Sequence, residues 1–253
     1  EMPLFSEHRV HQRSTGRPYP NKVTLEVNRE RKIERSYTVV HLENEYLDVL
    51  VLPEIGGRIF AARDKVTDYD FFYRQHVIKP GLIGALGSWI SGGVEFNWPY
   101  HHRPSGFLPC DFETEECGDG SVICWLSEHD PIDRMKGMVG IVLKPGCAYL
   151  ETRVKLCNRI PVTKSFLWWE NAAVPVNESY QIFFPKDVTY VNFHYLDSRI
   201  SYPIAGDATF NGIDMTTARD ISWHKNTKDA TSYFACASQY DFFGGYDHGL
   251  DCG

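Results

Sequence analysis

The chain has 253 residues, of which 43% are hydrophobic and 23% charged, and its 26 Lys and Arg against 33 Asp and Glu give a formal net charge of −7. This ordinary globular composition can bury a sizeable core, whereas the acidic balance argues against nucleic acid or an anionic membrane as a partner, because both attract a basic face. No apolar run reaches the roughly 18 residues of a membrane span, so we expect no membrane partner.

The expected elements are strands. Residues 1–20 are polar and contain Pro and Gly, which predicts an N-terminal arm, and residues 21–253 are expected to form one domain. Apolar residues partly alternate over residues 36–54, with a turn at Glu43–Asn44. Short strands with turn residues about every ten positions are typical of a sandwich or barrel. Because residues 244–253 form no closing element, we expect an all-β antiparallel sandwich that is incomplete at its C-terminus.

Two turns are marked by proline or glycine. Lys144-Pro145-Gly146 predicts the turn of a hairpin, since Pro fixes φ and Gly supplies a positive φ. The Gly56-Gly57 pair predicts a tight reversal ahead of a strand that begins at Arg58. Arg58 is either a surface residue at a strand bend or a group at the rim of a binding site.

A carboxylate, an amide, an indole and two imidazoles occur within the stretch GGVEFNWPYHH. Glu95 and Asn97 alternate with apolar residues, so a strand would present both on one face. The strand ends at Trp98, because the following Pro cannot donate to a ladder, and His101 and His102 then lie on a loop. Loops held on a rigid sheet concentrate binding groups. The alternative is a hydrogen-bonded strand edge with exposed histidines.

A second aromatic and polar group lies in the stretch SFLWWENAAVPV. The adjacent Trp168 and Trp169 point to opposite faces of a strand, so one lies in the core and the other on the outer face. Glu170 and Asn171 follow directly. An indole beside a carboxylate and an amide suits a sugar, whose C–H face stacks on the ring while polar groups bind hydroxyls. The alternative is a Trp-rich core with a capped strand end.

A third group lies in the stretch FFPKDVTYVNFHY, where Asn192 and His194 share one face of a strand. His194 is a candidate acid, because an unperturbed imidazole titrates near neutrality, and the alternative is a structural histidine. A metal held by Glu95, His101 and His102 is not expected, since adjacent histidines diverge. The seven scattered cysteines include no Cys-x-x-Cys pair, so we expect reduced thiols in a cytoplasmic protein. No G-x-S-x-G, P-loop or G-x-G-x-x-G motif is present, and we expect no cofactor.

Several of these stretches resemble known families. LPEIGGRIFAARDKVTDYDFFYR and GGVEFNWP, in a strand-rich chain, resemble the galactose mutarotase-like superfamily, and the second is similar to a Gly-Gly segment of its hexose-6-phosphate epimerase branch. More narrowly, GGVEFNWPYHHRP, DGSVICWLSEHDPIDRMKGM, WWENAAVPV and FFPKDVTYVNFH resemble a bacterial domain of unknown function that usually precedes tetratricopeptide repeats.

The superfamily resemblance implies a large mutarotase-like supersandwich whose concave face binds a sugar, with a His acid and a Glu base as in its epimerases. His101 and His102 stand about where the superfamily places one sugar-binding His. Its second, catalytic His has no counterpart in residues 168–171, and its Glu base corresponds to a segment after residue 253. The resemblance therefore implies glycoside hydrolysis or transfer rather than aldose epimerisation.

Together these observations predict a carbohydrate-binding cleft with aromatic walls. The competing prediction is a non-catalytic module that binds glycan or protein and serves a tetratricopeptide-repeat array. An exposed sheet edge would also allow a homodimer. The candidate catalytic residues are Glu95, Glu170, His101 and His194, and the candidate substrate-binding residues are Arg58, Asn97, Trp98, His102, Trp169, Asn171 and Asn192.

Overall fold

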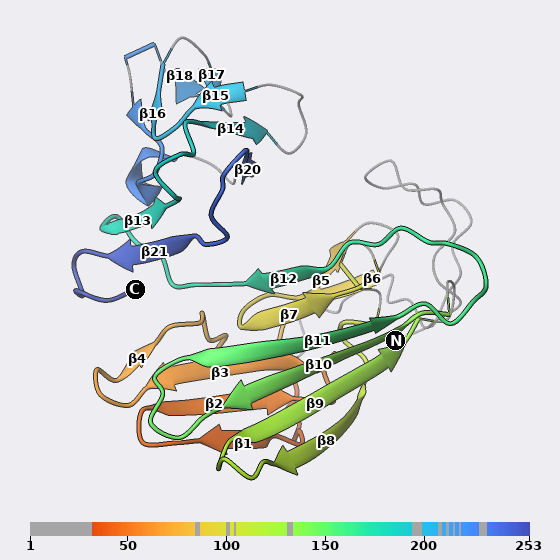
Figure 1. Cartoon of the computed structure of the whole chain (residues 1–253). Coiled ribbons are helices and arrows are strands. Elements are labelled where there is room, and N and C mark those ends of the chain that lie inside the picture. Colours follow the sequence, from red (N-terminus) through yellow and green to blue (C-terminus); the bar gives the residue numbers. More distant parts are fainter. Residues whose placement is uncertain are drawn as a thin grey trace. The chain divides into compact units, whose positions relative to one another are not determined.

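The computed structural model describes residues 32–83, 87–99, 102–103, 105–130, 134–193, 199–206, 209–210, 213–214, 216–217, 219–227 and 232–253. The predicted arm at residues 1–20 lies outside the described residues. Over the described residues the chain is mostly β, with several antiparallel sheets, no α-helix and no closed barrel (Figure 1), which confirms the prediction of an antiparallel, mostly β chain. In this part of the chain no helix is long and apolar enough to cross a membrane.

The chain divides into two compact units between Pro175 and Val176. A single domain can contain two such units, so the predicted domain over residues 21–253 stays a prediction.

The larger sheet of the first unit has the strand order β1 (Val40–Glu43), β2 (Leu47–Leu52), β3 (Arg58–Asp64), β7 (Val94–Asn97) and β12 (Trp169–Ala172), with β4 (Tyr69–Asp70) paired to β3. Its second sheet has the order β11 (Leu150–Cys157), β10 (Lys136–Leu143), β9 (Val122–His129) and β8 (Asp111–Glu116), and β5 (Pro80–Ile83) and β6 (Gly87–Ile90) form a separate hairpin.

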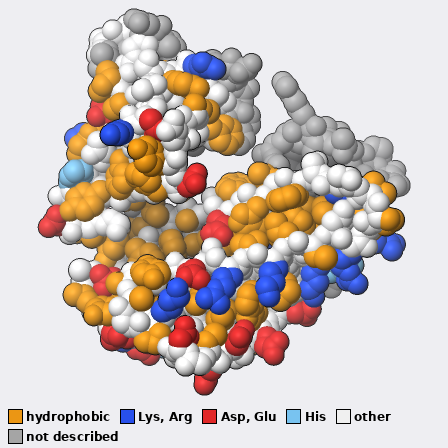
Figure 2. Space-filling view, in the orientation of Figure 1, with side chains coloured by type: hydrophobic (Ala, Val, Ile, Leu, Met, Phe, Trp, Pro, Cys, Tyr) orange, Lys and Arg blue, Asp and Glu red, His pale blue; other side chains and the backbone are white. Residues whose placement is uncertain are grey.

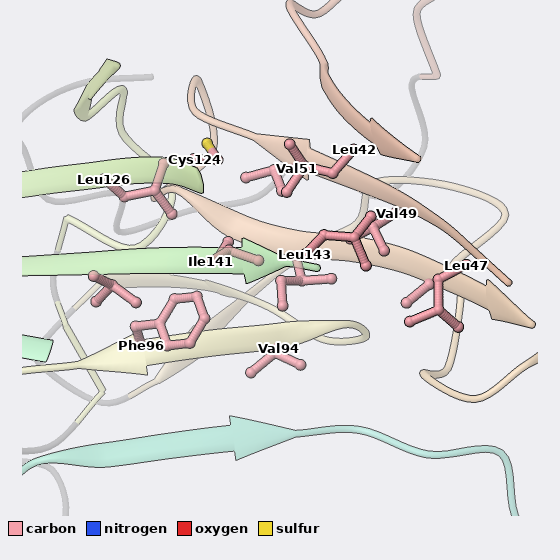
Figure 3. Close-up of a cluster of buried hydrophobic side chains, with 13 residues drawn as sticks. Leu42, Leu47, Val49, Val51, Val94, Phe96, Cys124, Leu126, Ile141 and Leu143 are labelled. Atoms are coloured by element: carbon pink, nitrogen blue, oxygen red, sulfur yellow. The ribbon is translucent and has the colours of Figure 1, made fainter. Parts of the chain in front are cut away.

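These two sheets pack around one hydrophobic core. Val94 and Phe96 point into it from β7, and Ile141 and Leu143 face them from β10 (Figure 3). Glu95 and Asn97 must then point to the opposite face of the sheet, as the alternation of side chains along a strand predicts. The remaining buried members of the core are Leu42, Leu47, Val49, Val51, Ile59, Ala62, Cys124, Leu126 and Val139.

Both predicted glycine turns are present. Gly146 has φ +69° in the turn between β10 and β11, and Gly56 and Gly57 have φ +67° and +61° immediately before β3. A Cβ on Gly56 would lie 2.3 Å from the carbonyl oxygen of Gly106, so this reversal requires glycine. The reversal fixes the start of β3 and therefore the place at which Arg58 enters the sheet.

The outer face of the second sheet is charged. Acidic residues predominate in β8, which is exposed along its whole length. Arg153 and Lys155 belong to β11, and Figure 2 shows a row of Lys and Arg side chains along this strand. Charges on an edge strand oppose pairing with another strand, so β8 is a poor edge for the predicted homodimer.

The second unit consists of short antiparallel pairs. The strand β13 (Tyr180–Phe183) pairs with β21 (Gly244–Asp247), and β14 (Tyr190–Phe193) lies between β15 (Arg199–Ser201) and β20 (Tyr233–Ala235). Shorter pairs join β16 (Ile204–Ala205) to β19 (Arg219–Asp220) and β17 (Thr209–Phe210) to β18 (Ile213–Asp214), and a 3-10 helix covers His224–Asn226. The unit has its own core, formed by Val188, Val191, Ile200, Ala205 and Ile221.

Candidate functional site

One face of the first sheet carries most of the polar residues predicted for a site. Because their neighbours in β7 point into the core, Glu95 and Asn97 point to the opposite, outer face. In the antiparallel pairing of β7 with β12, Asn171 lies opposite Glu95 and Trp169 lies opposite Asn97, and directly opposed residues share a face. We call outer-face site the group of Arg58, Trp89, Glu95, Asn97, His102, Trp169 and Asn171.

Glu95 is the centre of a hydrogen-bond network in this site. Its Oε1 atom lies 2.6 Å from Nδ1 of His102 and accepts a hydrogen bond from Nδ2 of Asn171 at 2.7 Å. An ionised carboxylate can only accept hydrogen bonds, so Nδ1 of His102 carries the proton of this contact. The carboxylate therefore fixes both the orientation of the imidazole and its tautomer.

The carboxyl group of Glu95 is ionised although Glu95 is only 9% exposed. Burial by itself raises the pKa of Glu95. The hydrogen bonds from His102 and Asn171, together with the charges of His102 and Arg58, outweigh burial and hold the pKa of Glu95 below its ordinary value. Glu95 is therefore equipped to accept hydrogen bonds and to stabilise positive charge, and it is not a proton donor near neutral pH.

Arg58 brings a buried positive charge to the same face. Its side chain is 4% exposed, its Nη1 donates to the carbonyl oxygen of Ile90, and its Nη2 lies 3.9 Å from Oε2 of Glu95. Burial lowers the pKa of Arg58 to about 10, the charge of Glu95 opposes this shift, and the charge of Arg103 adds to it. Arg58 is thus cationic at neutral pH and forms a loose ion pair with Glu95, longer than a hydrogen bond.

Two indole rings contact the imidazole of His102. The ring centroids of His102 and Trp169 are 4.5 Å apart with an interplanar angle of 62°, and those of His102 and Trp89 are 5.9 Å apart at 69°. Both indoles are partly exposed. Trp168, in contrast, stacks on Phe96 and packs against the core, which confirms the prediction that the adjacent tryptophans take opposite faces.

The loop that carries His102 is tied to the sheet through the next residue. The backbone N–H of Arg103 donates to Oδ1 of Asn97 at 2.9 Å, and its guanidinium donates to Glu128 of β9 and to the carbonyl oxygen of Gly56. Arg103 thereby joins three separate elements beside His102.

Three residues in this region, Arg103, Glu128 and Trp89, are not predicted by the sequence. The role of Arg103 and its partner Glu128 depends on strand order, for which the sequence contains no signal. Trp89 lies near the end of β6, shortly before the Gly92-Gly93 step that leads into β7, and its aromatic ring in the stretch GSWISGG is the signal that the sequence offers.

Trp98 does not lie with the outer-face group. It is 6% exposed, its ring centroid is 5.3 Å from that of Phe166, and a Cβ on Gly137 of β10 would lie 2.8 Å from its Cδ1. Trp98 therefore packs toward the second sheet, so it cannot serve as a stacking surface for a ligand on the outer face.

Glu170 also points away from the outer face. It lies opposite Phe96 in the β7–β12 pairing, so its side chain leaves the strand on the inner side, at an exposed edge. There its Oε1 accepts a hydrogen bond from Oγ1 of Thr152 at 2.9 Å. The two carboxylates that the sequence singles out, Glu95 and Glu170, are not brought together.

The remaining predicted residues lie elsewhere. Asn192 belongs to β14 of the second unit, where it is opposite Arg199 and Phe234. His101 and His194 lie outside the described residues. Within the described ranges, no group of three or more His, Cys, Asp or Glu side chains is arranged to hold a metal ion.

Comparison with known proteins places this fold in a family. The crystal structure of a TPR-domain containing protein from Parabacteroides distasonis ATCC 8503 is similar, with a TM-score of 0.71 and 23% identity over 85% of this chain and 34% of that one. This chain therefore spans about a third of that larger protein. The crystal structure of the Slr1438 protein from Synechocystis sp. PCC 6803 is similar at a TM-score of 0.51 and 11% identity, over 68% of this chain and 67% of that one. A family model described as Domain of unknown function (DUF5107) matches residues 15–253, and because this match covers most of the chain, the protein belongs to that family.

Proposed function

We propose that the outer-face site binds a carbohydrate and transfers a proton at one of its hydroxyl groups. The observation that carries this proposal is the hydrogen bond between Glu95 and His102 on one face of a sheet. The imidazole of His102 also contacts the indole of Trp169 there. Apolar ring surface beside a few fixed polar groups is the usual composition of a small-molecule site.

The binding part of the proposal rests on ring surface and amides. The partly exposed indoles of Trp89 and Trp169 suit the C–H faces of a pyranose ring. Asn97 and Asn171 project from neighbouring strands and suit hydroxyl groups. The fold supports the same conclusion by analogy, because two packed antiparallel sheets with a polar site on one sheet are what the galactose mutarotase-like superfamily uses for sugars.

The chemical part rests on the Glu95–His102 pair. An ionised carboxylate on Nδ1 fixes the orientation and the tautomer of an imidazole, which leaves its other ring nitrogen able to accept a proton and return it. Two-carboxylate hydrolysis by Glu95 and Glu170 has no such support, because the two side chains leave the sheet on opposite faces. Proton transfer by Glu95 and His102 is therefore the better-supported reaction class.

A glycan and aryl-glycoside screen of the full-length protein tests the proposal. For any sugar that is turned over, Glu95→Gln and His102→Asn should each lower kcat by about 100-fold, while Glu170→Gln leaves turnover unchanged. Turnover that survives both outer-face substitutions would remove the chemical role, and a wild-type protein that binds no sugar would remove the proposal as a whole.

A second candidate is an interaction module without chemistry. It is favoured by the similarity to a TPR-domain containing protein, of which this chain spans about a third. Under this alternative, sugars do not bind, and Trp169→Ala weakens attachment of this domain to a repeat segment supplied as a separate protein.

A further inference from the structure

We propose that the carbohydrate bound at the outer-face site is acidic, and that its carboxylate binds the guanidinium of Arg58. This inference rests on the proposed function and names the substrate class of the same site.

The first observation is a group of buried hydrogen-bond donors that have no partner. They are Nε of Arg58, Nδ2 of Asn97 and Nε1 of Trp89. Arg58 is 3% and Asn97 1% exposed. The amide orientation of Asn97 is fixed, because its Oδ1 already accepts from the backbone N–H of Arg103. Buried donors normally find acceptors, so a cluster of unpaired ones calls for a ligand with acceptor atoms.

These donors surround the Glu95–His102 pair. Arg58 is held next to Trp89 by the bond from Nη1 to the carbonyl oxygen of Ile90, and Trp89 contacts the ring of His102. Asn97 lies opposite Trp169, whose indole contacts the same imidazole. The three side chains therefore come from three strands and each neighbours a residue that contacts Glu95 or His102.

The second observation is which N–H groups of the Arg58 guanidinium have hydrogen-bond partners and which do not. Nη1 is bonded to Ile90, whereas Nε has no partner and Nη2 approaches the carboxylate of Glu95 only to 3.9 Å. Nε and Nη2 form one edge of the planar group, with two parallel N–H bonds that match the two oxygens of a carboxylate. Glu95 makes no hydrogen bond to this edge, since its Oε2 stays 3.9 Å from Nη2 and its Oε1 is engaged by His102 and Asn171.

The charges favour a carboxylate over a phosphate monoester. Arg58 and Arg103 are balanced by Glu95 and Glu128, so the group is neutral when His102 is neutral and carries one positive charge when His102 is protonated. A ligand with one negative charge, such as a carboxylate, is balanced by the single positive charge that a proton on His102 adds to this group. A dianion would leave one charge without a counterpart in a buried site, which is costly.

The test is a calorimetric titration of the full chain with D-galacturonate and D-glucuronate, with D-galactose, D-glucose and glucose 6-phosphate as comparisons. We expect the uronates to bind about tenfold or more tightly than the matched hexoses. Arg58→Gln should lower uronate affinity by about tenfold more than it lowers hexose affinity, and so remove this preference. The control is Arg63→Gln, because Arg63 also lies on β3 but is exposed and pairs with Asp48 and Asp68, so its loss should keep the preference.

Each other outcome rejects a defined part of the inference. Hexose binding without a preference for uronates overturns the acidic substrate class and leaves the proposed function standing. Tighter binding of glucose 6-phosphate than of the uronates overturns the carboxylate. Failure of every sugar to bind to the wild-type chain rejects the proposed function together with the inference. If Arg58→Gln fails to fold, Arg58→Lys keeps the charge without the two-bond edge and should reduce the preference, and if both fail, the wild-type ratio of uronate to hexose affinity decides.

Discussion

Nδ1 of His102 lies 2.6 Å from Oε1 of Glu95, and Asn171 donates to the same oxygen from the neighbouring strand. One carboxylate oxygen thus joins a loop, β7 and β12. The bond ties the outer face together and also gives it a defined electrostatic state, because it keeps Glu95 ionised next to the buried Arg58.

Removal of the charge of Glu95 should destabilise the protein. Glu95→Gln leaves the buried Arg58 without its carboxylate and weakens the contact with His102, so we expect a loss of about 2–3 kcal/mol in the free energy of unfolding. Urea denaturation measures this loss. The matched control is Glu170→Gln, since Glu170 is exposed and should change stability by less than about 0.5 kcal/mol. Equal effects of both substitutions would contradict the network described here.

The contribution of Glu95 should also depend on pH. Its pKa is lowered in the folded protein, so its stabilisation is fully present above the pKa of an unfolded-state glutamate and is lost as the pH falls through the lower folded-state pKa. The difference in unfolding free energy between the wild type and Glu95→Gln should therefore shrink toward acid pH. A difference that grows on acidification would mean that folding raises the pKa of Glu95 instead of lowering it.

The adjacent tryptophans should separate binding from folding. Trp169→Ala should weaken any sugar binding by about tenfold or more through the loss of ring contact, with a change in Tm of only a few degrees. Trp168→Ala opens the core beside Phe96 and should cost about 2–4 kcal/mol of stability. Glycan-array binding and thermal unfolding of both variants check this. An unchanged array signal for Trp169→Ala would exclude its ring from the site.

Local alternation accounts for what the sequence predicts correctly. In β7 it predicts that Glu95 and Asn97 share a face, and around β12 it separates Trp168 from Trp169. The same rule, applied strictly, places Glu170 on the face opposite Trp169. Adjacency in the sequence therefore does not bring Trp169, Glu170 and Asn171 into one site, because Glu170 leaves the strand on the other face.

What alternation cannot supply is strand order and register. Arg103 is bonded to the nearby Asn97 but also to Glu128 and Gly56, which lie 25 and 47 residues away in the sequence. Trp89 reaches His102 because the β5–β6 hairpin precedes a glycine step into β7, and no periodic pattern shows this contact. The division after Pro175 is likewise unmarked, because strands and turns continue across it with the same composition.

The Gly92-Gly93 step before β7 should not tolerate a side chain at Gly93. Gly93 has φ +63°, and a Cβ there would lie 1.9 Å from the carbonyl oxygen of Ile59. Gly93→Ala should therefore cost about 3 kcal/mol or more, because it combines a left-handed backbone with a steric clash directly before β7. Urea denaturation of the purified variant gives the value.

Gly118→Ala provides the control. Nothing lies within 4 Å of a Cβ at Gly118, and its φ is outside the left-handed range, so stability should change by less than about 1 kcal/mol. If Gly93→Ala proved as stable as Gly118→Ala, the approach of β7 to β3 described here would be wrong.

The most direct test of the outer-face site is a titration of the chain with the tightest-binding sugar, followed through the assigned indole N–H resonances of its six tryptophans. We expect binding at the outer-face site, so that the signals of Trp89 and Trp169 shift together and saturably while those of Trp125 and Trp223 stay in place. Saturable shifts confined to Trp125 or Trp223, with the signals of Trp89 and Trp169 unmoved, would contradict it.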